Sequence, residues 1–244
     1  MTTGPARCLA VLGGMSWEST ATYYRLINQG VAERLGGLHS APLLLHSVDF
    51  APIAAAQAAG RWDELAALLG AAARGLRHGG AGALLLATNT MHRLADRIEA
   101  TSGLPLLHIA DATGAALQAA GLRRVGLLGT RYTMEDGSIV ADRLRRRFGL
   151  QIDVPCAADR DALHRVIYGE LCRGRLEPAS RQEFIDVIRR LAERGAEGVI
   201  LGCTEIGLLI DADSSPLPVF DSTVLHAAAA VRWMLEGAPQ GDPA

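Results

Sequence analysis

Lysine is absent from this 244-residue sequence: all 24 residues counted as Lys or Arg are arginine. Pyridoxal-phosphate enzymes usually hold their cofactor as a Schiff base on a lysine, so this chemistry is excluded. A P-loop, which also needs its lysine, is excluded for the same reason. A coding bias toward arginine explains the absence, but the chemical consequence holds whatever its origin.

Cysteine is scarce as well. The four cysteines, Cys8, Cys156, Cys172 and Cys203, form no CxxC or CxxH pattern, and the seven histidines are scattered along the chain. This distribution predicts free thiols in a reducing compartment and no metal site.

Long apolar runs and strong charge are also missing. The apolar stretch near the amino terminus is too short for a signal peptide, and no run is long enough to cross a membrane. The formal net charge is −2, and the basic run at residues 145–147 falls inside a helical pattern. We therefore expect a cytoplasmic protein that binds neither nucleic acid nor membrane surfaces.

Short apolar runs alternate instead with segments of helical periodicity. This rhythm is typical of α/β proteins in which a mostly parallel sheet is flanked by helices on both faces. The predicted strands are residues 9–12, 42–48, 83–86, 104–109, 125–128, 151–154, 198–201 and 218–220. The predicted helices are residues 17–33, 62–78, 135–147, 160–173, 179–194 and 222–236, and the tail 237–244 is expected to fray.

The two halves of the chain resemble each other. Residues 78–90 and 192–205 share one layout, in which Gly and Ala precede an apolar run and a polar tetrad. Thr88 and Cys203, at equivalent places in these segments, are 115 positions apart, and the glycine-ending runs of the first and fifth predicted strands have the same separation. An offset this steady predicts a duplicated α/β unit, with two similar domains related by a pseudo-twofold axis.

We divide the chain accordingly. Residues 1–114 and 222–244 are predicted to form the first domain, with a returning C-terminal helix, and residues 115–221 the second. Thr88 and Cys203 would then lie at equivalent strand ends across one cleft, where open parallel sheets bind ligands. The polar segments after the strands suit carboxylates or phosphates, and no GxGxxG pattern favours a dinucleotide.

Cys203 is the strongest candidate for a nucleophile or a proton-transfer base. It follows the apolar run 198–201 and precedes Thr204 and Glu205, where the next helix is predicted to begin. A thiol at a helix N-terminus is more acidic and more reactive than an ordinary one. The alternative is a buried cysteine that only packs. The other three cysteines are expected to be inert, although Cys172 could approach the site.

Thr88 holds the place opposite Cys203, yet a hydroxyl is a poor acid or base near neutral pH. Its neighbours Asn89 and Thr90 can hydrogen-bond a carboxylate without bringing a charge of their own. The same residues are suited to capping the following helix, and both roles are compatible. His92 could polarise the site or simply pack, and the sequence leaves both interpretations open.

Seven motifs occur in order along the chain: LGGMSWEST (12–20), HSVDF (46–50), TNTMH (88–92), LLGTRYTM (127–134), IYGEL (167–171), GCTEI (202–206) and FDST (220–223). With these motifs the sequence resembles the cofactor-independent aspartate/glutamate racemases over nearly its whole length. The resemblance implies two similar α/β domains with the active site between them, an amino-acid substrate, a homodimer and no cofactor. It also implies two cysteines on opposite faces of the substrate Cα, where one thiolate removes the α-proton and the opposite thiol delivers another.

This chain departs from the two-cysteine pattern. GCTE supplies Cys203, but the motif usually written CNT reads Thr88-Asn89-Thr90. We therefore predict an asymmetric enzyme, in which Cys203 serves its own face as acid or base. Thr88 donates a proton, or passes one from water, more easily than it abstracts one. The equilibrium between enantiomers stays near unity, so the asymmetry is confined to the kinetic parameters of each substrate.

The resemblance also implies a set of substrate contacts. Arg173 lies near the IYGEL segment, where family members often carry a lysine that can hold a substrate carboxylate. Its guanidinium could do the same through its bidentate fork, or it could be solvated. Because this lysine is missing, the sequence leaves open whether the enzyme prefers a substrate with an acidic side chain. By motif position the predicted substrate-binding residues are Met15, Ser16, Gln57, Asn89, Thr90, Thr130, Arg173 and Thr204.

Two alternatives remain. One is a single-cysteine lyase or isomerase of the same superfamily, of the arylmalonate decarboxylase or maleate isomerase type, which the missing thiol favours. The other is a non-catalytic protein that binds a small ligand in the same cleft. The motifs TNTMH and GCTEI are closer to those of the racemases and favour that interpretation.

Overall fold

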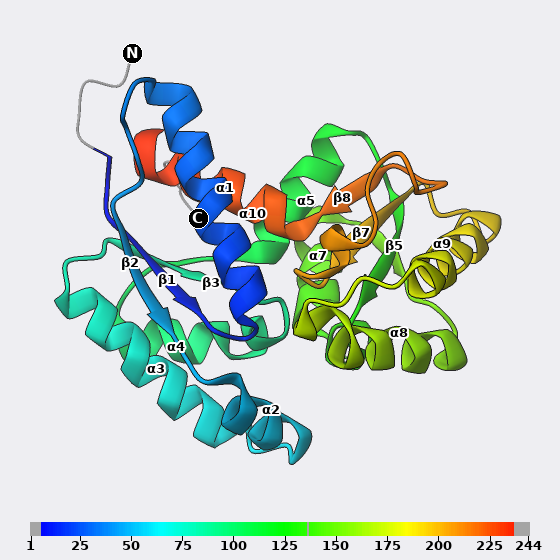
Figure 1. Cartoon of the computed structure of the whole chain (residues 1–244), viewed down its shortest axis with the longest axis horizontal. Helices are drawn as coiled ribbons and strands as arrows, with labels where there is room; N and C mark the ends of the chain where they lie inside the picture. Colours follow the sequence, from blue (N-terminus) through cyan, green and yellow to red (C-terminus); the bar gives the residue numbers. More distant parts are fainter. Residues whose placement is uncertain (1–5, 136, 237–244) are drawn as a thin grey trace. The chain divides into compact units, whose positions relative to one another are not determined.

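The strands form two four-stranded parallel sheets in the computed structural model, which describes residues 6–135 and 137–236 (Figure 1). The first sheet has the order β2-β1-β3-β4 and the second the order β6-β5-β7-β8. The strands are β1 (Leu9–Gly13), β2 (Leu43–Ser47), β3 (Ala83–Leu86), β4 (Leu106–Leu107), β5 (Arg124–Gly129), β6 (Gln151–Asp153), β7 (Gly198–Gly202) and β8 (Val219–Asp221). The predicted α/β class and all eight predicted strands are confirmed, although β4 is much shorter than expected.

Helices connect the strands and cover the sheets. The α-helices of the described residues are α1 (Trp17–Leu35), α2 (Phe50–Ala58), α3 (Trp62–His78), α4 (Ala95–Ser102), α5 (Ile109–Ala119), α6 (Arg131–Met134), α7 (Ile139–Phe148), α8 (Ala157–Gly169), α9 (Pro178–Glu193) and α10 (Ser222–Glu236). Three 3-10 turns accompany them: η1 (Thr90–Leu94), η2 (Leu171–Arg173) and η3 (Ile206–Leu208).

Two helices differ from their predicted bounds by more than two residues. The helix expected over 135–147 begins only at Ile139, because Ser138 caps it with a side-chain hydrogen bond to a first-turn amide. The helix expected over 160–173 ends before Glu170, which leaves the helical conformation at φ −124° and ψ −66°. A separate 3-10 turn then carries the chain onward. Local capping and backbone geometry thus set ends that the apolar periodicity misplaced.

The contacts between residues group the chain into two compact units. Among the described residues, unit 1 comprises 6–87, Leu94–Leu107 and 226–236, and unit 2 comprises Thr88–Arg93 and His108–Leu225. The segment after β3 therefore groups with unit 2, although β3 itself belongs to unit 1. The predicted domain boundaries remain predictions, and the predicted fraying of the tail concerns residues outside those described.

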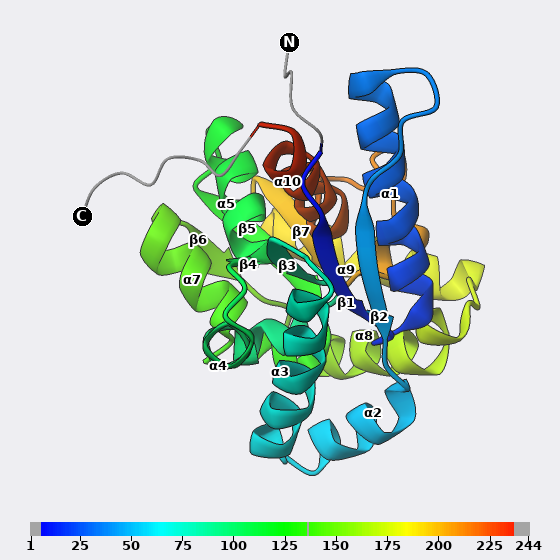
Figure 2. The ribbon, with the colours of Figure 1, turned by 90° about the vertical axis from the view of Figure 1, so that its left-hand side faces the viewer.

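Helices cover both faces of each sheet. In unit 1, α1 and α10 pack on one face of β1 and β3 through a cluster that includes Tyr23 and Val231, while α3 lies on the other side (Figure 1, Figure 2). In unit 2, α8 and α9 pack on one face of β5 and β7 around Phe184, and α5 and α7 pack on the other around Leu144. The central strands are consequently buried and apolar along their length, as parallel sheets require.

The two sheets share one topology. Strands β1 to β4 correspond in order to β5 to β8. Leu86 of β3 and Leu201 of β7 each pair with the second-to-last residue of the neighbouring central strand. Thr88 lies two residues after Leu86, and Cys203 lies two residues after Leu201. The two residues therefore occupy equivalent positions in two copies of one strand arrangement. The predicted pair of similar α/β units is confirmed.

Candidate active site

Three polar segments of unit 2 are joined by side-chain hydrogen bonds. Thr90 Oγ1, after β3, lies 3.2 Å from Thr130 Oγ1, after β5, and Thr130 Oγ1 lies 3.2 Å from Thr133 Oγ1. Asn89 Nδ2 donates to Ser222 Oγ, at the start of α10, over 3.1 Å. The structure therefore brings the predicted residues Asn89, Thr90 and Thr130 into one cluster at the carboxyl ends of parallel strands.

Asn89 also has an atom available to a ligand. The residue is 4 % exposed, and its Oδ1 has no hydrogen-bond partner among the described residues. Leaving a buried acceptor without a partner costs about 1–3 kcal/mol, so a hydrogen-bond donor is favoured at this oxygen. An ammonium or amide group of a ligand would supply one.

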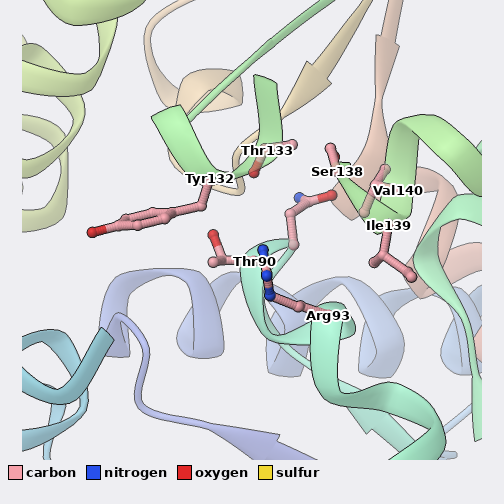
Figure 3. A pocket seen from close by; sticks show the side chains of 8 residues that line it. Thr90, Arg93, Tyr132, Thr133, Ser138, Ile139 and Val140 are labelled. Carbon is pink, nitrogen blue, oxygen red and sulfur yellow. The ribbon is translucent and has the colours of Figure 1, made fainter. Parts of the chain in front are cut away.

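A pocket opens beside this cluster (Figure 3). Arg93 and Thr90 lie on one side of it, below Tyr132 and Thr133, and the cap and first two residues of α7, at 138–140, lie on another. The wall combines hydroxyl groups, a helix N-terminus and a guanidinium, which together suit a carboxylate. The lining residues are Asn89, Thr90, Arg93, Tyr132, Thr133, Ser138, Ile139 and Val140.

Thr88 is buried, and its backbone is held by His92. His92 Nδ1 lies 2.8 Å from the carbonyl oxygen of Thr88, and its Nε2 accepts the amide of Ile109 over 3.2 Å. Because Nε2 accepts, the ring proton is assigned to Nδ1, which donates to Thr88. Of the two interpretations that the sequence left open for His92, the structure supports packing, because both ring nitrogens bind the backbone.

Cys203 follows β7 and is 6 % exposed. Its thiol donates to Glu205 Oε2 over 3.0 Å, and the hydroxyl of Thr204 donates to the same oxygen over 2.8 Å. Burial, followed by the negative charge of Glu205, raises the pKa of the Cys203 thiol well above its ordinary value. The predicted acidic thiol at a helix N-terminus is therefore wrong: the chain after Glu205 forms only the three-residue 3-10 turn η3.

Cys172 and Arg173 lie on η2, the turn that follows α8. Cys172 is partly buried beside Glu205, and burial, followed by the charge of that carboxylate, raises the pKa of its thiol. Two thiols, those of Cys172 and Cys203, thus surround one buried carboxylate. Arg173 is exposed at the end of the turn, and its contact with a substrate remains a prediction.

Three predicted substrate contacts lie in unit 1. Met15 and Ser16 follow β1 and are buried, and Gln57 on α2 is buried as well. Ser16 caps α1, because its side chain accepts the amide of Ser19. Gly14, at φ +91°, lies so close to the backbone after β2 that any Cβ would collide with it. These features fix the loop, and its contact with a substrate remains a prediction.

Several residues of this site were not assigned from the sequence. Glu205 and Ser222 belong to the GCTEI and FDST motifs, so a signal for them was present but carried no stated role. No sequence feature pointed to Thr133, Tyr132 and Arg93. Their proximity depends on how the segments after β3 and β5 pack together.

Within residues 6–135 and 137–236, no group of three or more His, Cys, Asp or Glu side chains could hold a metal ion. The helices of that part of the chain are all too short or too polar to span a membrane.

Comparison with known proteins identifies the family of this chain. Residues 12–230 match the Asp/Glu/hydantoin racemase family. The chain belongs to this family. The predicted resemblance is confirmed, and the TNT and GCTE segments both lie inside the matched region.

Solved structures of similar proteins support the assignment. A candidate Asp/Glu racemase from Yersinia pestis is 50 % identical to this family member, with a TM-score of 0.87 over 94 % of this chain and 100 % of that one. An aspartate racemase homologue from Pyrococcus horikoshii OT3 is 29 % identical, with a TM-score of 0.81 over the same shares. The aspartate racemase of Picrophilus torridus, 19 % identical with a TM-score of 0.75 over 93 % of each chain, shares the fold.

Proposed function

We propose that this chain is a cofactor-independent racemase that acts on aspartate, glutamate or both. Membership of the Asp/Glu/hydantoin racemase family and 50 % identity to a candidate Asp/Glu racemase support the reaction class. The observation that carries the proposal is the buried thiol of Cys203 at the end of β7, at the position equivalent to Thr88 after β3. A cytoplasmic homodimer is part of the same proposal.

The proposed chemistry is proton transfer at the substrate Cα. The thiolate of Cys203 takes the α-proton from one face and becomes a thiol, and the Cα electron pair remains as a carbanion. Thr88, or a water that it orients, delivers a proton to the opposite face and recovers one from solvent. A hydroxyl donates to a strongly basic carbanion readily but removes an α-proton poorly, so the two directions of the reaction use unequal groups.

The pocket of unit 2 supports an α-amino acid as the substrate. Thr90, Thr130 and Arg93 offer a carboxylate hydroxyl donors and a positive charge, while Asn89 Oδ1 offers the substrate ammonium an acceptor. Asn89 is itself fixed by Ser222, so the acceptor is held in place before the ligand binds. The full set of proposed contacts adds Met15, Ser16, Gln57, Arg173 and Thr204.

A single-cysteine lyase or isomerase of the same superfamily is the second candidate. The observation that favours it is the hydroxyl of Thr88 at the position equivalent to the thiol of Cys203. A decarboxylase needs only one proton donor at the carbanion, so one cysteine would suffice.

Hydrogen exchange at Cα tests the proposal. The purified protein is incubated in deuterated water with single enantiomers of aspartate, glutamate and several neutral amino acids, without added cofactor, and the α-hydrogen is followed by NMR. We expect exchange and inversion with the acidic amino acids. No exchange with any of them would contradict the racemase and favour the lyase or a binding protein.

A cysteine pair provides the control for this experiment. Cys203→Ser is expected to abolish exchange, whereas Cys156→Ser, at an exposed cysteine that precedes α8, should leave it unchanged. If Cys203→Ser kept the wild-type exchange rate, Cys203 would not be the proton-transfer group.

A further inference from the structure

Cys203 and Glu205 form a hydrogen-bonded pair inside unit 2. The thiol donates to Glu205 Oε2 over 3.0 Å, and Thr204 Oγ1 donates to the same oxygen over 2.8 Å. Glu205 is 2 % exposed, so its carboxylate is removed from water almost completely. The group to which the proposed function assigns proton transfer therefore directs its own proton at a buried carboxylate.

Losing the thiol proton to solvent would be costly in these surroundings. Burial raises the pKa of the Cys203 thiol most, and the charge of Glu205 raises it further. Loss of the proton to water would place two negative charges side by side in a buried site. When the proton moves to Glu205 instead, the negative charge passes from oxygen to sulfur, and the pair keeps a single charge. Transfer within the pair therefore avoids the second buried negative charge.

We propose that Glu205 accepts the thiol proton of Cys203 and thereby produces the thiolate that removes the substrate α-proton. This inference rests on the proposed function. The Sγ–H bond breaks as an Oε2–H bond forms, and the thiolate then takes the α-proton while the Cα electron pair stays on the carbanion. After reprotonation on the opposite face, Glu205 returns its proton to solvent and Cys203 is again a thiol.

Cys172 separates this role from mere proximity to a carboxylate. Its thiol is also beside Glu205, and burial together with the Glu205 charge raises its pKa. The raised pKa keeps it a thiol at neutral pH, and no substrate proton is assigned to it. Cys172→Ala is therefore the comparison variant, because it removes a neighbour of Glu205 without removing the Cys203–Glu205 pair.

Glu205→Gln tests the proposal, because glutamine keeps the size of the side chain and an acceptor oxygen but takes no proton. We expect kcat for α-hydrogen exchange to fall on the order of 10²–10³-fold, in the range ascribed to a general base, with KM little changed. The ultraviolet absorbance of the thiolate, taken as the difference from the same protein carrying Cys203→Ala, should show Cys203 ionising at lower pH. We therefore expect Glu205→Gln to contain more Cys203 thiolate at a given pH than the wild type and yet to turn over more slowly. Cys172→Ala should change turnover far less than Glu205→Gln does, and Cys156→Ser, at an exposed cysteine, should leave it unchanged.

Glu205→Gln should give the opposite result if Glu205 only repels the negative charge of the Cys203 thiolate. Turnover at neutral pH would then stay level or rise together with the thiolate population, and the proposal would be overturned. A structural role predicts another pattern: turnover falls together with the free energy of unfolding, and the pH dependence of kcat is unchanged. That result would also overturn the proposal.

Glu205→Asp keeps the test decisive if Glu205→Gln does not fold. The shorter carboxylate still takes a proton but reaches Sγ less well, so exchange should persist at reduced kcat, and an unchanged kcat would contradict the proposal. Absence of exchange in the wild-type protein would count against the proposed function. Exchange in wild type that Glu205→Gln leaves intact would count against this inference alone.

Discussion

The imidazole of His92 bridges two backbone segments of unit 2. Its Nδ1 donates to the carbonyl oxygen of Thr88 over 2.8 Å, and its Nε2 accepts the amide of Ile109, the first residue of α5, over 3.2 Å. His92 is 1 % exposed. The ring thus positions Thr88 by its backbone.

Removing this bridge should destabilise the protein. His92→Leu leaves a buried carbonyl and a buried amide without this partner, so we expect a loss of roughly 2–4 kcal/mol in the free energy of unfolding. Urea unfolding measures it. His39→Ala, at an exposed histidine, should change the same quantity by about 0.5 kcal/mol or less. Equal effects of the two variants would show that the bridge contributes nothing.

Thr88→Cys should restore a second thiol at the end of β3. Because the two enantiomers have equal free energies, kcat/KM must be the same in both directions, and the asymmetry appears in the two kcat values and the two KM values separately. We expect Thr88→Cys to raise turnover most for the enantiomer whose proton Thr88 must remove, by roughly tenfold or more. Initial rates from each pure enantiomer, followed by circular dichroism, give both kcat values.

Thr88→Ser provides the control for this prediction. It keeps the hydroxyl and should leave the ratio of the two kcat values close to that of the wild type. A Thr88→Cys protein with the wild-type ratio would contradict one-sided proton transfer.

Asp221 should give the folded state a pH dependence in the acid range. Its Oδ1 accepts the amides of Thr223 and Val224 at the start of α10, but burial outweighs these bonds and raises the pKa of the carboxyl above its ordinary 3.8. The folded state therefore binds more protons than the unfolded state as pH rises from 3.8 to the folded pKa. The contribution of Asp221 to stability is present below 3.8 and is lost through that window.

Asp221→Asn isolates this effect, because asparagine keeps an acceptor for the cap but does not titrate. The free energy of unfolding of Asp221→Asn minus that of the wild type should increase as pH rises through the same window and then stay constant. Urea unfolding at a series of acid pH values measures the difference. A difference that did not vary with pH would contradict the raised pKa.

Gly207 should not tolerate a side chain. It lies in η3 against the carboxylate of Asp221, and a Cβ there would collide with Oδ2 while that side chain is held by the cap of α10. We expect Gly207→Ala to lower the free energy of unfolding by about 1–3 kcal/mol. Gly75→Ala is the matched control: it lies inside α3 with nothing within 4 Å of the added Cβ, and should raise the same quantity by roughly 0.5–1 kcal/mol. Two variants of equal stability would show that Asp221 moves aside freely.

The central strands could be predicted because each is buried on both faces. Residues 83–86 and 198–201 had to be apolar throughout, and their runs end where the polar loops begin. The repeat between the halves was visible for the same reason, since both copies keep one strand order. Helix ends at 138 and 170 were misplaced, because a single capping side chain or backbone angle sets them.

The sequence by itself determined the reaction class to be considered: it excluded lysine chemistry, and its motifs indicated a racemase family to which the chain belongs. It also identified Thr88 and Cys203 as equivalent positions, because strand ends are encoded locally. Only the tertiary structure decided how those positions behave. Burial and a neighbouring carboxylate make the Cys203 thiol less acidic, and His92 binds backbone rather than substrate. Both outcomes depend on contacts and on exclusion of water, which arise only when segments far apart in the chain pack together.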